Sequence, residues 1–267
     1  MNKVISYSLY GSNPRYLKPL LLTARDITCV LPGWSIWVYH DFTVPKVIID
    51  ELIELGVKVI NLSGTEYYTW APKFWRFLPV LKENVDTVLF RDADSIITKR
   101  EAILVNLWMG SNFKAQIIRD HQLHIAPIMA GMFGLKKDLF PFFAGQLHHN
   151  EDFKRKRDYS SDQKFLAKKI YSAIKFDSLV HTSFFSYPGE NRIRIQKCRD
   201  TNFIGAVYNS LEENYIFEYD FMVGIPFWLA RAFQFKTRPV LYVSKYLEYL
   251  KGLLYKSHLI KEEVDFD

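Results

Sequence analysis

The sequence predicts an α/β fold, a single domain in which helices flank a mostly parallel central sheet. Short β-prone runs alternate with helical patterns through roughly the first half of the chain, which is the order expected of βαβ units. One of these runs, residues 87–90, is almost purely apolar, as a strand buried on both faces of a sheet should be. The 267 residues of the chain are enough for one large domain of this kind.

The first quarter of the chain shows the alternation in order. Residues 4–8 form a β-prone run that stops at a turn rich in Gly, Asn and Pro, and residues 16–30 then carry apolar side chains at near-helical spacing. Residues 34–40 form the second β-prone run. A second helix follows, which begins at Pro45, a first-turn position that tolerates proline, and ends at Gly56.

The alternation continues to about residue 120 and becomes less regular beyond it. Three more strands are expected over 57–62, 87–90 and 115–118, and two more helices over 73–82 and 100–108. In the second half, residues 128–135 and 179–185 are β-prone, and a helix capped by Ser or Asp begins at 160–163 and runs to about Tyr171.

Composition and charge limit the kinds of protein and the kinds of partner that the sequence allows. Hydrophobic residues make up 49% and charged residues 24%, which is typical of a globular protein and not of a disordered one. A net charge of +6 favours anionic partners such as nucleoside diphosphates, nucleic acid or an anionic membrane surface. No nucleic-acid-binding signature is present, so we expect no nucleic-acid partner.

The chain also lacks the marks of secretion or membrane insertion. Its two cysteines are far apart, which argues against a disulfide framework or a zinc site and for a reducing compartment. The N-terminus has no signal-peptide pattern, and no window is apolar enough to span a bilayer. We therefore expect a cytoplasmic protein. Two segments could contact a membrane surface. The basic run 154–157 either does so or is a solvated loop, and the Leu- and Lys-rich segment 246–259 either does so or packs on the domain.

The segment Asp92-Ala93-Asp94 carries the strongest functional signal. Two carboxylates placed two residues apart make a hard oxygen site that suits Mg²⁺ or Mn²⁺ together with substrate phosphates. The alternative is a polar turn with solvated acids. The segment follows a buried strand, and ligands of parallel sheets bind beyond the carboxyl ends of the strands, where Tyr10, Gly11 and Asp41 also fall.

Several other side chains are candidates for the same site. Lys73 and Arg76 lie three apart on one helix face and can meet a diphosphate, or they form a solvated basic side. Arg91 either pairs with the carboxylates or touches a phosphate. Gly131, in a β-prone run, marks either a close approach of the backbone to a ligand or tight packing.

The general base and a third metal ligand are less well defined. Asp162 can deprotonate an acceptor hydroxyl or can be a helix N-cap. Asp120, which follows a strand, is the second candidate for the base. His181 can add a nitrogen ligand to the metal, although a lone histidine in an apolar run is more often structural.

These residues resemble the glycosyltransferases of the GT-A fold, whose Rossmann-like domain carries a DXD motif after an apolar strand. Ala130-Gly131 and then Asp162-Gln163 at a helix start follow in the same order as in that family. The pattern is similar to small enzymes of bacteria and large DNA viruses that build surface polysaccharides or capsid glycans. It continues through Arg91–Ser95, Arg100-Glu101, Arg119-Asp120-His121 and Gly131-Met132.

The resemblance implies a UDP- or GDP-sugar donor, with a UDP-sugar preferred, Mn²⁺ or Mg²⁺, and a glycan or glycoprotein acceptor. Asp94 would bind the metal, and Asp92 would contact the sugar or ribose and often the metal. Further donor contacts are implied for Ser8, Tyr10, Gly11, Asp41, Ala130, Gly131 and Gln163. The expected division is a donor half over 1–121, an acceptor half over 122–210 and an extension over 211–267. In a viral protein the location would be the host cytoplasm.

The sequence departs from this family in two places, and two rival functions stay open. No clear C-terminal histidine stands where some relatives bind the metal, and nothing after about residue 208 matches the pattern. A nucleotidyltransferase or phosphohydrolase would also use paired carboxylates with Mg²⁺, although the stretch after the first strand is poor in glycine. A non-catalytic module that binds a nucleotide or a sugar would need neither a base nor a metal.

Overall fold

The structure is a computed structural model. It describes residues 1–149, 161–184, 186–196, 203–209, 214–216 and 263–264. The basic run 154–157 and the segment 246–259 lie outside the described residues, and of the expected extension 211–267 only two short strands are described. Within the described part of the chain, no helix is long and apolar enough to cross a membrane.

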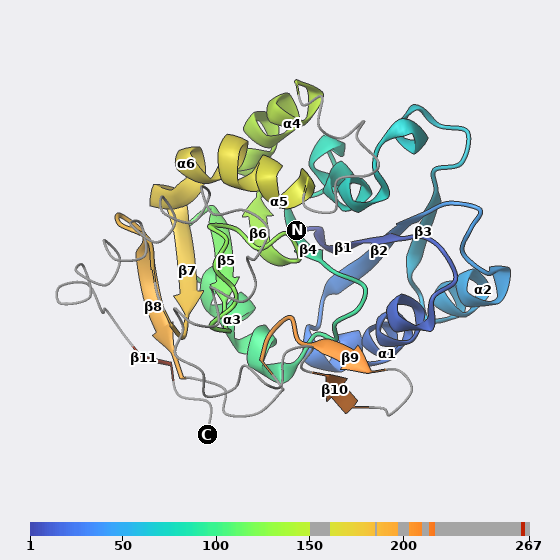
Figure 1. Ribbon diagram of the computed structural model, residues 1–267, viewed down its shortest axis with the longest axis horizontal. Helices are drawn as coiled ribbons and strands as arrows, with labels where there is room; N and C mark the ends of the chain where they lie inside the picture. Colours follow the sequence, from blue (N-terminus) through green and yellow to red (C-terminus); the bar gives the residue numbers. More distant parts are fainter. Residues whose placement is uncertain (150–160, 185, 197–202, 210–213, 217–262, 265–267) are drawn as a thin grey trace, which may run out of the picture.

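Nine strands form one sheet in the order β11-β8-β7-β5-β6-β4-β1-β2-β3 (Figure 1). Their bounds are β1 Lys3–Leu9, β2 Trp34–His40, β3 Lys58–Asn61, β4 Thr87–Arg91, β5 Ala115–Arg119, β6 Met132–Lys136, β7 Ser178–Thr182, β8 Asn191–Ile195 and β11 Glu263–Val264. Only β6 runs antiparallel to its neighbours β4 and β5, and the other pairs in this sheet are parallel. The prediction of an α/β fold with a mostly parallel sheet is confirmed.

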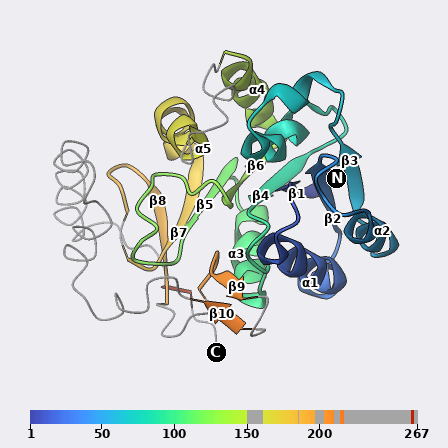
Figure 2. The ribbon, with the colours of Figure 1, turned by 45° about the vertical axis from the view of Figure 1, so that its right-hand side comes forward.

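Helices cover both faces of the sheet, and Figure 2 shows them on opposite sides. On one face lie α1 Pro14–Val30, α2 Lys46–Glu54 and α3 Lys99–Met109, whose apolar side chains share one core cluster. The other face carries the 3₁₀ helix η2 Pro72–Leu81, α4 Phe140–His148, α5 Ser161–Phe165, the π-helical turn η5 Leu166–Ile170 and α6 Tyr171–Ile174. The short 3₁₀ turns are η1 Glu66–Thr69, η3 Lys137–Leu139 and η6 Lys175–Asp177, and β9 Val207–Asn209 pairs with β10 Asn214–Ile216 as a separate ribbon.

The two helices α1 and α3 begin where their sequences provide a cap. The side chain of Asn13 accepts a hydrogen bond from the backbone N–H of Arg15, and that of Thr98 accepts one from Glu101. These contacts satisfy backbone donors that have no partner inside the helix. The start of α1 therefore lies directly beyond the end of β1, at the edge of the sheet where the sequence places the site.

Two expected elements differ from the prediction in type or in position. The helix expected over 73–82 is instead the 3₁₀ helix η2 over Pro72–Leu81, with Pro79 inside it. The run 128–135 becomes a strand only at Met132. Ala130 and Gly131 lie in a turn, since the N–H of Met132 bonds back to the carbonyl of Met129 and that of Ala130 bonds to the Gln163 side chain.

The core on the η2 side of the sheet is built largely from phenylalanine. Phe77, Phe90, Phe133, Phe143 and Phe165 are buried, and their rings contact one another with centroids 4.5 to 6.3 Å apart. Such offset and edge-on pairs add to the free energy gained from burial alone. Much of the 16% aromatic content is therefore core and not sugar-binding surface.

We predict that Gly134→Ala destabilises the fold. A Cβ at Gly134 of β6 would lie 2.8 Å from Leu89 Cδ2 and 2.9 Å from the Trp108 ring, so the core would be overpacked by about 1–3 kcal/mol. The matched control is Gly145→Ala in α4, where a Cβ meets nothing within 4 Å and should raise stability by up to about 1 kcal/mol. Urea unfolding measures both, and equal stabilities of the two variants would contradict the packing at β6.

Candidate functional site

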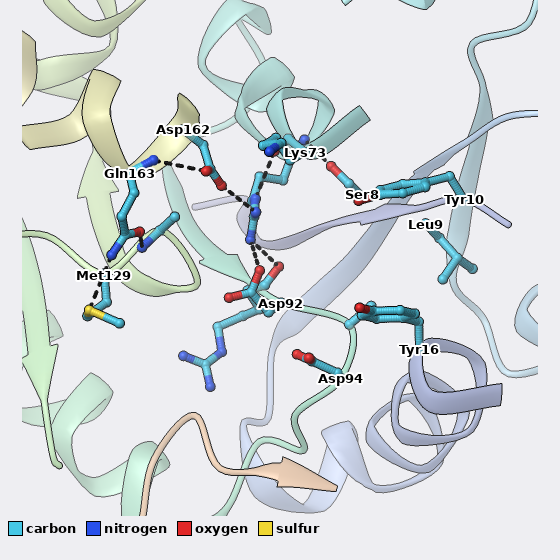
Figure 3. A pocket seen from close by; sticks show the side chains of 14 residues that line it. Ser8, Leu9, Tyr10, Tyr16, Lys73, Asp92, Asp94, Met129, Asp162 and Gln163 are labelled. Carbon is cyan, nitrogen blue, oxygen red and sulfur yellow. Dashed lines mark hydrogen bonds and ion pairs between the residues drawn. The ribbon is translucent and has the colours of Figure 1, made fainter. Parts of the chain in front are cut away.

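A pocket of about 380 Å³ opens beyond the carboxyl ends of β1 and β4 (Figure 3). The end of β1, the first turn of α1, helix η2, the Asp92–Asp94 loop, the 129–130 turn and the start of α5 surround it. It is lined by Ser8, Leu9, Tyr10, Tyr16, Lys73, Arg76, Arg91, Asp92, Ala93, Asp94, Met129, Ala130, Asp162 and Gln163. Residues from both 1–121 and 122–210 therefore meet in one pocket.

Arg76 lies between Asp92, which was expected to contact the donor and the metal, and Asp162, which was a candidate for the general base. Its guanidinium forms ion pairs with Asp92 and, at 2.9 Å, with Asp162. The Arg76 side chain is 6% exposed, and that of Asp162 is 9% exposed. Burial lowers the pKa of Arg76, but the two carboxylates outweigh burial and raise it. Arg76 therefore stays charged and holds Asp92 and Asp162 on either side of it.

The first strand fixes the position of Arg76. Ser6 Oγ donates a hydrogen bond to the Arg76 carbonyl at 2.7 Å, and Ser8 Oγ accepts one from the Arg76 N–H at 2.8 Å. Ser8 was expected to face the donor, and it does line the pocket while it anchors η2. The two serines lie on the same face of β1 because side chains alternate along a strand.

Asp94 lies deeper in the loop than Asp92, with side-chain exposures of 18% and 50% respectively. Arg15 at the start of α1 pairs with it at 3.5 Å. Burial and then the neighbouring Asp92 carboxylate raise the pKa of Asp94 to about 6, and Arg15 opposes this rise without cancelling it. The backbone of the loop is held from the other side, where Tyr208 donates to the Asp94 carbonyl at 2.9 Å.

The Asp92 and Asp94 carboxylates fit a small divalent cation. They are hard oxygen donors, and a cation would stabilise the charged form of Asp94, whose pKa is raised first by burial and then by the Asp92 carboxylate. Among the residues that the structure describes, no group of three His, Cys, Asp or Glu side chains could hold a metal. Mg²⁺ and Mn²⁺ accept such a pair when phosphate oxygens and water complete the coordination.

His181, the expected third metal ligand, does not line this pocket. It lies on β7, separated from β4 by β5 and β6, and its side chain is fully buried. Its Nδ1 lies 3.3 Å from the Gln116 amide nitrogen, and burial lowers its pKa to about 3. The alternative interpretation of His181 was a structural histidine in an apolar run, and its full burial favours that alternative.

Asp120, the second candidate for the general base, does not line the pocket either. It is 1% exposed, and Arg100 pairs with both of its oxygens at 2.7 and 2.8 Å. Ser183 Oγ and the N–H of Ile204 donate further hydrogen bonds to it at 2.7 and 3.0 Å. The Asp120 carboxylate accepts all of these hydrogen bonds. It therefore links the end of β5 to α3 and to the 203–206 turn.

Gly11 and Asp41 support the pocket without lining it. Thr43 joins them, because its hydroxyl accepts from the Gly11 N–H at 2.6 Å and donates to the Asp41 carboxylate. Gly131 also has a supporting role, since a Cβ there would lie 2.0 Å from Asp92 Oδ2. The close approach that its glycine indicated is thus to the side chain of Asp92.

Arg91 lines the pocket, but its ion pair is not with the carboxylates of the Asp92–Asp94 loop as expected. It forms an ion pair, but with buried Glu101 at 2.7 Å instead of with the Asp92 or Asp94 carboxylates. Its other guanidinium nitrogen donates to the Gly131 carbonyl at 2.6 Å. Arg91 therefore ties β4 to α3 and to the turn before β6, which places Asp92 and Gly131 side by side.

Sequence reasoning missed Arg15, Tyr16 and Met129. Arg15 and Tyr16 lie in the first turn of α1, and their position directly after a strand end was the available signal. Met129 Sδ accepts from the Gln163 amide at 3.3 Å, and the Ala130 N–H donates to the other end of that amide at 2.9 Å. No local pattern pointed to Met129, because the contact depends on how α5 packs against the turn.

No protein-family model matches the sequence, and no curated protein matches it. Among solved structures, the chain is similar to a glycosyltransferase involved in glycosylation of the major capsid of PBCV-1, with 14% identity and a TM-score of 0.46 over 68% of this chain and 82% of that one. It is similar to the galactosyltransferase LgtC, with 14% identity and a TM-score of 0.46 over 70% and 75% of the two chains. A 4-diphosphocytidyl-2C-methyl-D-erythritol synthase from Anaerococcus prevotii has 13% identity and a TM-score of 0.42 over 62% and 81%.

We predict that Asp120→Asn lowers stability and leaves ligand binding in the pocket unchanged. The substitution removes the charge that compensates Arg100 in a buried pair, a loss of about 3–5 kcal/mol in the free energy of unfolding. Urea unfolding gives the stability, and calorimetry with UDP and Mn²⁺ gives the affinity. A variant with normal stability but a specific loss of sugar transfer would return Asp120 to the role of general base.

Proposed function

We propose that the protein is a metal-dependent glycosyltransferase that moves a sugar from a nucleoside-diphosphate sugar to a hydroxyl of a glycan acceptor. The observation that carries the proposal is the meeting of Asp92, Asp94, Arg76 and Asp162 in one pocket at the carboxyl edge of a mostly parallel sheet. Ligands of such sheets bind at this edge. A UDP-sugar is the donor we favour, on the resemblance of the motifs.

The diphosphate of the donor would lie beside Asp92 and Asp94. Mn²⁺ or Mg²⁺ bound by these two carboxylates would neutralise the charge that develops on the departing diphosphate. Lys73 lines the same pocket and would add a positive charge on the η2 side. Arg76 is committed to Asp92 and Asp162, so we assign it to the positioning of these carboxylates and, through them, of the donor.

The rest of the pocket would divide between the nucleoside and the sugar. Tyr10 and Tyr16 offer aromatic surface near the end of β1, where a base and ribose would lie. Asp162 and Gln163 lie on the opposite wall of the pocket, where they offer oxygen and nitrogen atoms for sugar hydroxyls (Figure 3). The acceptor hydroxyl would approach from this second wall.

Asp162 is the proposed general base. It lines the pocket, and burial raises its pKa although Arg76 opposes the rise. A carboxylate whose pKa is raised accepts a proton more readily from an attacking hydroxyl. Attack in a single displacement would invert the configuration of the anomeric carbon.

We predict that Asp94→Asn abolishes metal-dependent binding of the donor. A panel of UDP-, GDP- and dTDP-sugars with Mn²⁺ should raise the melting temperature of the wild-type protein, because a ligand at 100 times its Kd stabilises the folded state by about 2.7 kcal/mol. The control is Asp26→Asn, an exposed aspartate on α1. Full stabilisation of the Asp94 variant by the same donor would refute the metal site, and binding that needs no metal would favour a non-catalytic module.

We predict that Asp162→Asn separates binding from chemistry. The variant keeps a polar partner for Arg76, so donor affinity should change by only a few-fold, while kcat should fall by about 10²–10⁴-fold. Steady-state transfer assays with a saturating donor measure this. A loss confined to the KM of the donor would instead make Asp162 a sugar-binding residue. Release of pyrophosphate from a nucleoside triphosphate in the presence of a sugar phosphate would instead favour a nucleotidyltransferase.

A further inference from the structure

Arg15 pairs with a carboxylate of the pocket more loosely than Arg76 does. The Arg15 guanidinium lies 3.5 Å from Asp94, and the Arg76 guanidinium lies 2.9 Å from Asp162. The side chain of Arg15 is 35% exposed, whereas that of Arg76 is 6% exposed. A longer, partly exposed ion pair contributes little free energy, because water competes for both charges. Arg15 can therefore leave Asp94 at a small cost, while Arg76 stays with its two carboxylates.

Arg15 lies at the rim of the pocket, in the first turn of α1. Its guanidinium contacts Asp94 and lies 5.9 Å from the centre of the Tyr16 ring. Tyr16 and Asp94 both line the pocket, and Figure 3 shows them on the same side of it. The backbone N–H groups of Arg15 and Tyr16 already bond to Asn13. Of these groups, the Arg15 side chain is therefore the one that can respond to an anion beside Asp94.

The pairing of Arg15 with Asp94 places a positive charge where the proposed metal would bind. Arg15 and a divalent cation would compete for the same carboxylate, and their like charges would repel each other. A diphosphate reverses this relation, because its negative charge attracts the metal and the guanidinium together. A guanidinium also binds phosphate oxygens through two parallel hydrogen bonds, which a phosphate beside Asp94 would allow Arg15 to form.

We propose that Arg15 neutralises Asp94 until the metal binds there, and that it then binds the diphosphate of the donor. The inference rests on the proposed function, from which it takes the metal and the diphosphate. Arg15 would oppose the binding of metal alone and favour the binding of metal together with the nucleotide. The coupling is reciprocal, so each ligand would raise the affinity of the protein for the other. The protein would then take up its metal mainly together with the donor.

The test is a pair of titrations on the full chain. Binding of Mn²⁺ alone is followed by the electron paramagnetic resonance signal of unbound Mn²⁺, and binding of UDP with saturating Mn²⁺ is followed by calorimetry. Arg15→Gln should raise the affinity for Mn²⁺ alone by about twofold to fivefold, because the competing charge is gone. The same variant should lower the affinity for UDP with Mn²⁺ by about tenfold. Arg15→Lys keeps the charge and should keep the weak binding of Mn²⁺ alone.

The matched control is Arg25→Gln, the same change on the same helix. Arg25 also forms an ion pair, with Glu51 at 2.6 Å, and lies about 15 Å further along α1. This variant alters the net charge equally and should bind Mn²⁺ and UDP as the wild type does. Burial and Asp92 raise the pKa of Asp94 to about 6, and Arg15 opposes the rise. The titrations are therefore made at about pH 8, so that protons do not compete with the metal.

The outcomes separate this inference from the proposed function. Unchanged or weaker binding of Mn²⁺ alone to Arg15→Gln, or an unchanged affinity for UDP with Mn²⁺, would overturn the inference and leave the proposed function standing. Equal changes in Arg25→Gln would indicate a general effect of charge and would overturn it as well. If the wild type showed no metal-dependent binding of UDP, the proposed function and the inference would both be wrong.

Discussion

The contact on which the proposed site depends is the guanidinium of Arg76 between Asp92 and Asp162. It joins three segments that are far apart in sequence, namely η2, the loop after β4 and the start of α5. Without a cation there, two buried or half-buried carboxylates would face each other across the pocket, and their repulsion and desolvation would favour opening it. The serine contacts from β1 hold this cation at the edge of the sheet.

The same solution recurs among buried carboxylates that do not line the pocket, which pair with arginines that are buried or nearly so. Arg91 pairs with Glu101, Arg100 with Asp120, and Arg119 with Glu190. Such pairs contribute little net stability compared with apolar packing, but the loss of one partner is severe, so they enforce one arrangement of the strands and helices that carry them. They explain why so many of the charged residues singled out in the sequence are structural.

Asp94 differs from these paired carboxylates. Its arginine is 3.5 Å away and partly exposed, and its pKa is raised to about 6 by burial and by Asp92. The loop that carries it is held from both sides, by β4 before it and by the contact with Tyr208 after it. A rigid carboxylate with incomplete compensation is a suitable place for a cation that arrives with its ligand.

From the sequence, the α/β class, the strands of the first half and the place of Asp92-Ala93-Asp94 at the carboxyl edge of the sheet could all be predicted. These predictions depend on the periodicity of apolar residues and on the rule that ligands bind at the carboxyl edge of parallel strands. Both can be applied to residues that are close together in the sequence. Only the tertiary structure could separate Asp162, which lines the pocket, from Asp120 and His181, which do not. The three look alike in sequence, because a side chain's access to the pocket depends on partners that are distant along the chain: Arg76 for Asp162, Arg100 for Asp120 and the neighbouring strand β5 for His181.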